Sequence, residues 1–261
     1  EMAQRVAQGD DHALRTVREA EALRASSYQQ PTVAPLLGDT KWNQGWPFNA
    51  HVPMFDGTNL SATGCVATAM AQVMMYHRWP DVLKADIPAY TTSTYNLNVE
   101  GMAAGEKIDW DNMLPQYLEG QYSYDNIEAV SKLMLMCGAA VNMDYGPSSG
   151  AGVSAYTMTH FLGYDPHTTM SVGRAGVTLE QWVDAIDNDL LAERPILYAG
   201  YSSDGGHQFV LDGTDGRGLY HVNWGWGGYQ DGYFDISTLN PAKGGTGSGM
   251  AADGYNTYNS M

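Results

Sequence analysis

Residues 63–77 read TGCVATAMAQVMMYH and place a cysteine behind a glycine turn at the start of a long apolar run. Apolar positions recur at steps of three and four over 66–77, which predicts a buried helix that stops before Trp79-Pro80. The first N–H groups of a helix have no partner within the helix and the macrodipole is positive there, so this position favours a thiolate. Cys65 is therefore the candidate nucleophile of a cysteine enzyme.

A histidine far downstream supports this interpretation over the alternative, a cysteine that only fills the core of a helix. His207 follows two glycines in GGHQFVLDG, residues 205–213, and Asn223 lies in LYHVNWGWGG, residues 219–228. In papain-like enzymes the histidine and asparagine follow the cysteine by roughly 130 to 150 residues. His207 falls in that range and Asn223 lies just beyond it. His221 is the competing base, although it could instead bond Asn223 on the same strand face.

The composition is that of a compact globular protein, with 44% hydrophobic and 16% charged residues. A net charge of -16 argues against nucleic acid as a partner, because phosphate binding needs clustered Lys and Arg. No stretch reaches the roughly 18 apolar residues of a membrane span. The histidines share no ligand spacing, so the sequence predicts no metal and no other cofactor. Cys137 lies in an apolar helical run and is expected in the core, not in a disulfide.

The pattern along the chain predicts an α+β fold in two lobes. Further helices are expected at about 125–137 and 178–192, the second opened by a capping box of Thr178 and Gln181. Turn-rich residues 88–124 should be irregular. Beyond Pro195, short alternating runs separated by glycine turns predict an antiparallel meander of four strands, at 196–200, 208–212, 218–223 and 232–236. The helical lobe, roughly 45–190, would carry the nucleophile and the β lobe, roughly 195–261, the histidine, with a cleft for an extended peptide.

The first 27 residues differ in charge from the rest. Their basic and acidic residues nearly cancel on a polar helical pattern, whereas the remaining chain is strongly acidic. Such a change marks a boundary. An ordinary N-terminal helix packed on the domain is the alternative.

With these residues in place, the chain resembles the streptopain-type, papain-like cysteine peptidases over most of residues 30–261. The resemblance also rests on WNQG at 42–45, on MDYGPSSG at 143–150 and on the run from Tyr220 to Gly228. It implies a secreted endopeptidase that forms a thioester on its cysteine and is made as a zymogen. Residues from Gln30 onward match the mature start, so 1–29 would be the remnant of an inhibitory propeptide.

The roles of individual residues combine chemistry with this resemblance. His207 would act as base and then acid, Asn223 would orient it, and Trp224 would shield the pair from water. The resemblance assigns the oxyanion hole to the Gln44 amide together with the backbone N–H of Cys65. The residues expected to contact substrate are Gly206, Ser149, Gly150, Ala151 and Trp226. Gln208 and Ala151 depart from the family pattern, which leaves subsite preference open; an apolar residue second before the cut is implied by resemblance alone.

Protein substrates and the chain's own propeptide are the expected partners, and neither nucleic acid nor a membrane is. Two alternative functions stay open on the sequence. The same triad could serve another thiol acyl-transfer enzyme, a transglutaminase or an amidase. A papain-fold binding module without activity is the other, disfavoured because every catalytic position is filled.

Overall fold

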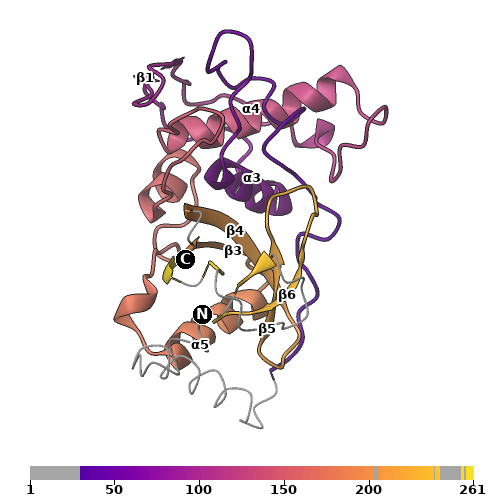
Figure 1. The fold of residues 1–261 in the computed structure, drawn as a ribbon, viewed down its shortest axis with the longest axis vertical. Coiled ribbons are helices and arrows are strands. Elements are labelled where there is room, and N and C mark those ends of the chain that lie inside the picture. Colours follow the sequence, from indigo (N-terminus) through magenta and orange to yellow (C-terminus); the bar gives the residue numbers. More distant parts are fainter. Residues whose placement is uncertain (1–29, 203–204, 238, 242–253, 256) are drawn as a thin grey trace. The chain divides into compact units, whose positions relative to one another are not determined.

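A computed structural model describes residues 30–202, 205–237, 239–241, 254–255 and 257–261 (Figure 1). The predicted propeptide remnant lies outside these residues. The chain forms two compact units. The helical unit comprises 39–171 and 225–227, and the sheet unit comprises the described residues among 172–224 and 228–261 together with 30–38.

Two helices that pack on one another form the core of the helical unit. Helix α3 spans Cys65–His77 and α4 spans Tyr124–Ala140 (Figure 1). Helix α4 begins with a capping box, in which Ser123 and Asn126 each bond the other's backbone N–H. The helix predicted after the glycine turn is confirmed, and Cys65 is its first residue. Cys137 is fully buried and its Sγ lies 3.5 Å from Sδ of Met74, so it fills the core as predicted.

The rest of the helical unit is mostly loops, as predicted for 88–124. Its short elements are the paired strands β1 (Tyr90–Thr91) and β2 (Asn98–Val99), the 3₁₀ turn η1 (Trp110–Asn112) and the π-helical turn η2 (Thr157–Phe161). These loops still bury large side chains, such as Trp42, Tyr145 and Trp110, and Nε1 of Trp110 donates to the carbonyl of Pro80.

An antiparallel sheet of five strands, in the order β6-β5-β4-β3-β7, dominates the sheet unit. Its strands are β3 (Ile196–Ser202), β4 (Gly205–Thr214), β5 (Leu219–Asn223), β6 (Gly232–Asp235) and β7 (Thr257–Ser260). The predicted meander of four strands is confirmed. Strand β7 was not predicted, because its sequence TYNS has no run of apolar residues. A bulge between Leu211 and Gly213 bends β4 where it pairs with β5.

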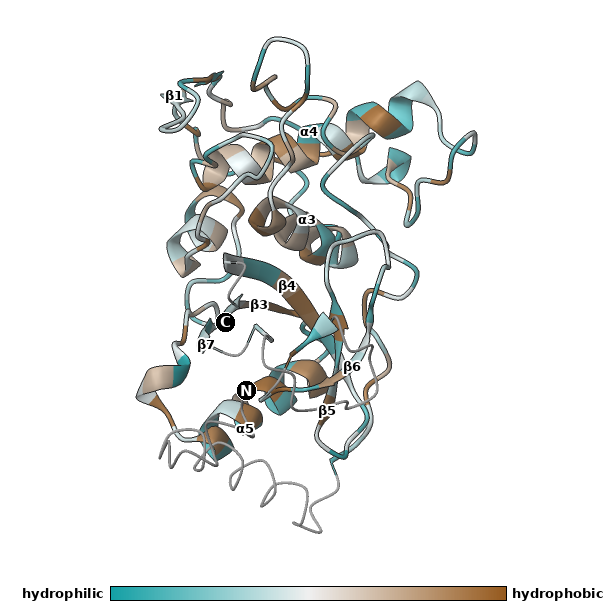
Figure 2. Ribbon diagram, viewed as in Figure 1, coloured by the Kyte–Doolittle hydropathy of each residue, from teal (hydrophilic) through white to brown (hydrophobic). Residues whose placement is uncertain are grey.

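Helix α5 (Leu179–Leu191) packs on this sheet, and its apolar residues are the brown stretch in Figure 2. It begins with the predicted capping box, and a 3₁₀ turn, η3 (Arg174–Gly176), precedes it. Buried Trp182 donates from Nε1 to the hydroxyl of Tyr198 on β3. The sequence analysis counted this helix in the helical lobe. It belongs to the sheet unit because its apolar face, with Ile186 and Leu190, has the sheet to bury against.

No helix among the described residues is long and apolar enough to cross a lipid bilayer. Likewise, the described part of the chain holds no group of three or more His, Cys, Asp or Glu side chains suited to a metal ion.

Candidate active site

The backbone before Cys65 sets the direction of the nucleophile's N–H. The carbonyl of Gly64 accepts the N–H of Thr68, 3.1 Å away, and so points into helix α3. In a trans peptide the N–H points opposite to the carbonyl, so the N–H of Cys65 points out of the helix start. Cys65 itself is half-buried, while Thr63 and Gly64 are buried. The nucleophile therefore stands at the start of the helix with its backbone N–H directed out of it.

Only glycine fits the position before the nucleophile. Gly64 has φ of 87°, a conformation that side chains disfavour, and a Cβ there would lie 2.6 Å from the Sδ of Met143. Thr68 closes the turn from the helix side, because its hydroxyl bonds both the carbonyl of Gly64 and the hydroxyl of Thr63. The glycine of the TGC stretch is thus a steric requirement of the turn.

Gln44 lies beside the same turn. Its carbonyl accepts the N–H of Thr63 at 3.0 Å, which joins Gln44 to the backbone two residues before the cysteine. The neighbouring Trp42 is fully buried and anchors this segment, donating its own N–H to Oε1 of Gln72 on α3. The position fits an oxyanion-hole residue, and the bond of its side-chain amide to an oxyanion stays a prediction.

Trp226 lies in residues 225–227, which belong to the helical unit. This short stretch is bonded to the segment that contains Trp42 and Gln44. Gly227 donates its N–H to the carbonyl of Trp42 at 2.9 Å. Trp226 is half-buried. Its predicted contact with substrate is untested, but its backbone is attached beside Asn43 and Gln44, since a Cβ on Gly227 would lie 3.5 Å from the Asn43 amide.

The segment predicted to contact substrate forms a closed loop. Asp144 and Gly150 exchange backbone hydrogen bonds of 3.0 and 3.3 Å. Gly150 is exposed and Ala151 is half-buried, so both are accessible to a ligand. Ser149 differs from them, because it is 8% exposed and its hydroxyl is engaged with backbone groups of Ala62 and Gly146.

In the sheet unit, His207 lies on β4 and is 7% exposed. Its Nε2 lies 2.8 Å from the backbone carbonyl of Trp224. A carbonyl can only accept, so Nε2 carries the proton and Nδ1 of the neutral ring holds the lone pair. The ring also stacks on the fully buried Trp224 indole, with centroids 6.2 Å apart and planes at 18°. Backbone and ring of Trp224 together fix the orientation of the imidazole.

The contact of His207 with a backbone carbonyl was not predicted. The sequence analysis gave the orienting role to the side chain of Asn223, which is buried next to Trp224, at the end of β5. That role stays a prediction, while the carbonyl of Trp224 already holds Nε2. A backbone acceptor leaves no signature in the sequence, because every residue carries the same carbonyl. The aromatic side chain of Trp224 is the one feature of the sequence that points to a contact between residue 224 and His207.

The neighbours of His207 on β4 have distinct positions. Gly206 is exposed and lies against the Tyr201 ring, since a Cβ there would come within 2.8 Å of it. Gln208 is buried, and strand alternation places it on the opposite face of β4 from His207. This departure from the family pattern therefore does not flank the imidazole.

The competing base, His221, takes part in a different contact. Its Nδ1 lies 2.6 Å from Oδ1 of Asp212, whose other oxygen accepts the N–H of Leu37 at 3.0 Å. The N-terminal segment is further held by two hydrogen bonds of 2.9 Å between Val33 and Thr214. His221 is thus paired with the buried Asp212, which helps to fasten residues 33–37 to the sheet.

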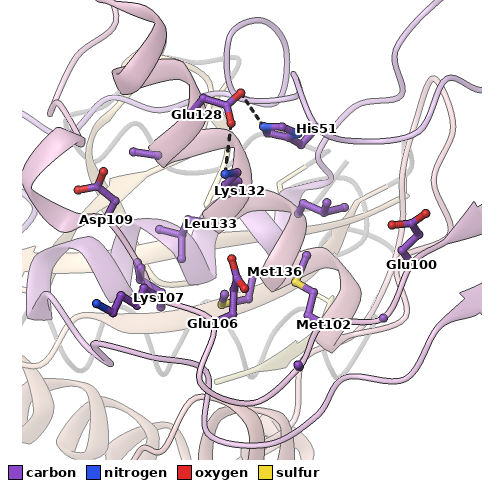
Figure 3. Close-up of a pocket in the computed structure, with 15 residues that line it drawn as sticks. His51, Glu100, Met102, Glu106, Lys107, Asp109, Glu128, Lys132, Leu133 and Met136 are labelled. Carbon is purple, nitrogen blue, oxygen red and sulfur yellow. Dashed lines mark hydrogen bonds and ion pairs between the residues drawn. The ribbon is translucent and has the colours of Figure 1, made fainter.

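A cavity of about 400 Å³ in the helical unit is separate from the predicted site residues (Figure 3). It is lined by residues 100–103 and 106–109, by one face of α4 and by His51. Glu128 projects at its rim, where it contacts His51 at 2.9 Å and Lys132 at 3.3 Å. None of the predicted catalytic or substrate-binding residues lines this cavity.

Known proteins resemble most of this chain. The model of the peptidase C10 family matches residues 42–234. Streptopain from Streptococcus pyogenes is 39% identical over 253 residues, which cover 89% of this chain and 62% of streptopain. The thiol protease/hemagglutinin PrtT of Porphyromonas gingivalis is 33% identical over 236 residues, covering 87% of this chain and 27% of that protein. The chain therefore spans less than two thirds of the length of these relatives.

Solved structures agree with the fold. The active wild-type interpain A cysteine protease of Prevotella intermedia matches with a TM-score of 0.79 and 32% identity, over 90% of this chain and 95% of that one. A mutant fragment of prointerpain A matches with a TM-score of 0.75 and 33% identity, over 90% and 72%. The predicted papain-like α+β fold is confirmed, and the chain belongs to the peptidase C10 family.

Proposed function

We propose that this chain is a cysteine endopeptidase that hydrolyses protein substrates through Cys65. The observation that carries the proposal is the place of Cys65 as the first residue of α3, with its N–H directed out of the helix start beside Gln44. A nucleophile and an oxyanion donor are both needed for acyl transfer, and here they share one rigid turn. Membership of the peptidase C10 family and the likeness to an active cysteine protease support it.

The proposed reaction has two steps. The thiolate of Cys65 attacks the peptide carbonyl carbon, and the resulting oxyanion accepts hydrogen bonds from the N–H of Cys65 and from the Gln44 amide. Protonated His207 then donates its Nδ1 proton to the leaving amine, and a thioester remains on Cys65. Water attacks that thioester while Nδ1 takes its proton, which releases the acid and the thiolate.

The charge of His207 follows from its surroundings. Burial lowers the pKa of His207 to about 4, and the hydrogen bond to the Trp224 carbonyl opposes that shift. The ring alone is therefore neutral at pH 7. A nearby thiolate favours the imidazolium, so in the proposed pair the proton on Nδ1 depends on the charge of Cys65.

Secretion and zymogen processing belong to the same proposal. The likeness to a prointerpain A fragment supports a propeptide in residues 1–29 that inhibits until it is cut off. The partners would be protein substrates and this propeptide. A transglutaminase or amidase, and a binding module without activity, are the outcomes that would replace the proposal.

Incubation with casein tests the reaction class. Wild-type protein should cleave casein, an epoxide thiol inhibitor should block the cleavage, and Cys65→Ala should abolish it. Cys137→Ala is the matched control and should stay active, since burial raises the pKa of the Cys137 thiol and keeps it protonated. Amine incorporation without cleavage would favour a transglutaminase. Equal loss in two well-folded variants would remove Cys65 from the mechanism.

The oxyanion role of Gln44 has a kinetic signature. Gln44→Ala should lower kcat by roughly 10²- to 10³-fold, because the lost donor acts mainly in the transition state. Alkylation of Cys65 by a small haloacetamide should keep its rate, since that displacement forms no carbonyl oxyanion. Wild-type kcat in Gln44→Ala would show that the side chain is not an oxyanion donor.

The state of His207 can be measured without turnover. In Cys65→Ala, which lacks the thiolate, the His207 ring should titrate near the value set by burial, about 4. NMR of the ring C–H signals between pH 3 and 8, assigned with His207→Gln, gives this value. The folded state then binds fewer protons than the unfolded chain between about 4 and 6.5, so unfolding free energy should fall as pH drops through that window. A pKa of His207 near 6.5 in Cys65→Ala would contradict the burial of its ring.

Self-processing tests the propeptide. Active protein should cut its own chain near Gln30, while Cys65→Ala stays intact. Mass spectrometry of both samples over time gives the new N-terminus. A fully active chain that still carries Glu1 after long incubation would assign residues 1–29 to the mature domain.

A further inference from the structure

We infer that Ser149 is a positioning residue that holds the turn before Cys65, so that the nucleophile's N–H and Gln44 keep their geometry. The resemblance to the family places Ser149 among the residues that contact substrate. Its buried hydroxyl instead bonds the chain three residues before the nucleophile. The inference rests on the proposed peptidase function and adds a residue to it.

The hydroxyl of Ser149 uses both its donor and an acceptor on backbone groups. Its oxygen lies 2.7 Å from the carbonyl of Ala62 and 3.2 Å from that of Gly146, and it accepts the N–H of Gly146 at 3.0 Å. A hydroxyl has one hydrogen, so the nearer carbonyl, that of Ala62, is its main acceptor. Ala62 in turn donates its N–H to the carbonyl of Gly146 at 2.9 Å. The loop thereby fixes both the N–H and the C=O of Ala62.

The turn needs such support because it contains a glycine. Gly64 has no side chain to restrict its own φ, and its positive value is one of several that glycine adopts readily. Neighbouring groups must therefore select it. A Cβ on Gly64 would lie 3.3 Å from Cβ of Ser149, so Ser149 packs directly against this residue as well as bonding Ala62.

The loop that carries Ser149 is itself anchored. The carboxylate of Asp144 accepts hydrogen bonds from the hydroxyls of Ser93 and Thr94, at 2.8 and 2.6 Å. Tyr90 donates its hydroxyl to the carbonyl of Met143 at 2.8 Å. Because the loop is anchored, the hydroxyl of Ser149 holds Ala62, and with it the turn, in a fixed position.

Removal of the hydroxyl should act on the chemical step. Ser149→Ala leaves the carbonyl of Ala62 and the N–H of Gly146 without this partner. A small displacement of the oxyanion donors should lower kcat by roughly 10- to 100-fold, with KM changed less than about two-fold. Haloacetamide alkylation of Cys65 should stay near normal, because helix α3 still begins at that residue.

Ser131→Ala is the matched control. Ser131 is buried like Ser149, and its hydroxyl donates to a backbone carbonyl, that of Ile127, within α4. It should keep kcat, because this hydrogen bond lies within α4. Equal kcat losses in the two variants would reduce Ser149 to a stability role. A raised KM with unchanged kcat in Ser149→Ala would restore the substrate contact, and unchanged kcat and KM would refute positioning.

A second pair of variants tests the positioning role of Ser149 if Ser149→Ala does not fold, or if the wild-type chain cleaves no substrate. Ser149→Thr and Ser149→Val have the same shape and differ in the hydroxyl. The N–H of Thr63 donates to the carbonyl of Gln44. Its hydrogen exchange should be faster in the Ser149→Val variant than in the Ser149→Thr variant. Equal exchange overturns the inference. This readout needs no catalysis, so loss of casein cleavage by wild-type protein counts against the proposed function only.

Discussion

The glycine turn before Cys65 is fixed by hydrogen bonds from two distant parts of the chain and from helix α3, and the position of the nucleophile depends on this turn. Thr63 donates to Gln44, Ala62 bonds both Gly146 and Ser149, and Gly64 closes onto Thr68. Each bond fixes one peptide plane of the turn. Because the turn is buried, breaking any of them leaves a polar group unpaired, which costs about 1–3 kcal/mol. These planes set the direction of the Cys65 N–H.

The histidine is oriented by different means. The backbone carbonyl of Trp224 holds Nε2 of His207, and the indole of the same residue covers the ring. A carbonyl fixes the tautomer without adding a charge, so burial still lowers the pKa of the imidazole. A neutral ring with its lone pair on Nδ1 is the form that a general base requires. The proposed peptidase thus relies on backbone groups in each unit, the N–H of Cys65 in the helical unit and the carbonyl of Trp224 in the sheet unit.

The sequence predicted features that local rules determine. Helix α3 and its cysteine, the capping box at Thr178 and the four-strand meander all follow from periodicity, caps and turns over a few residues. It missed features that depend on distant partners. The hydroxyl of Ser149 bonds a carbonyl 87 residues away, and α5 joins the sheet unit because the sheet covers its apolar face. Strand β7 has a polar sequence and is defined only by its pairing with β3.

The central claim is that this turn presents an oxyanion site at Cys65. A crystal structure of the protein with a peptide aldehyde bound covalently to that cysteine tests it most directly, because the adduct is tetrahedral and carries the oxygen in question. The account predicts that this oxygen lies within about 3.1 Å of the backbone N of Cys65 and of the side-chain nitrogen of Gln44. An adduct oxygen turned away from both donors would contradict it.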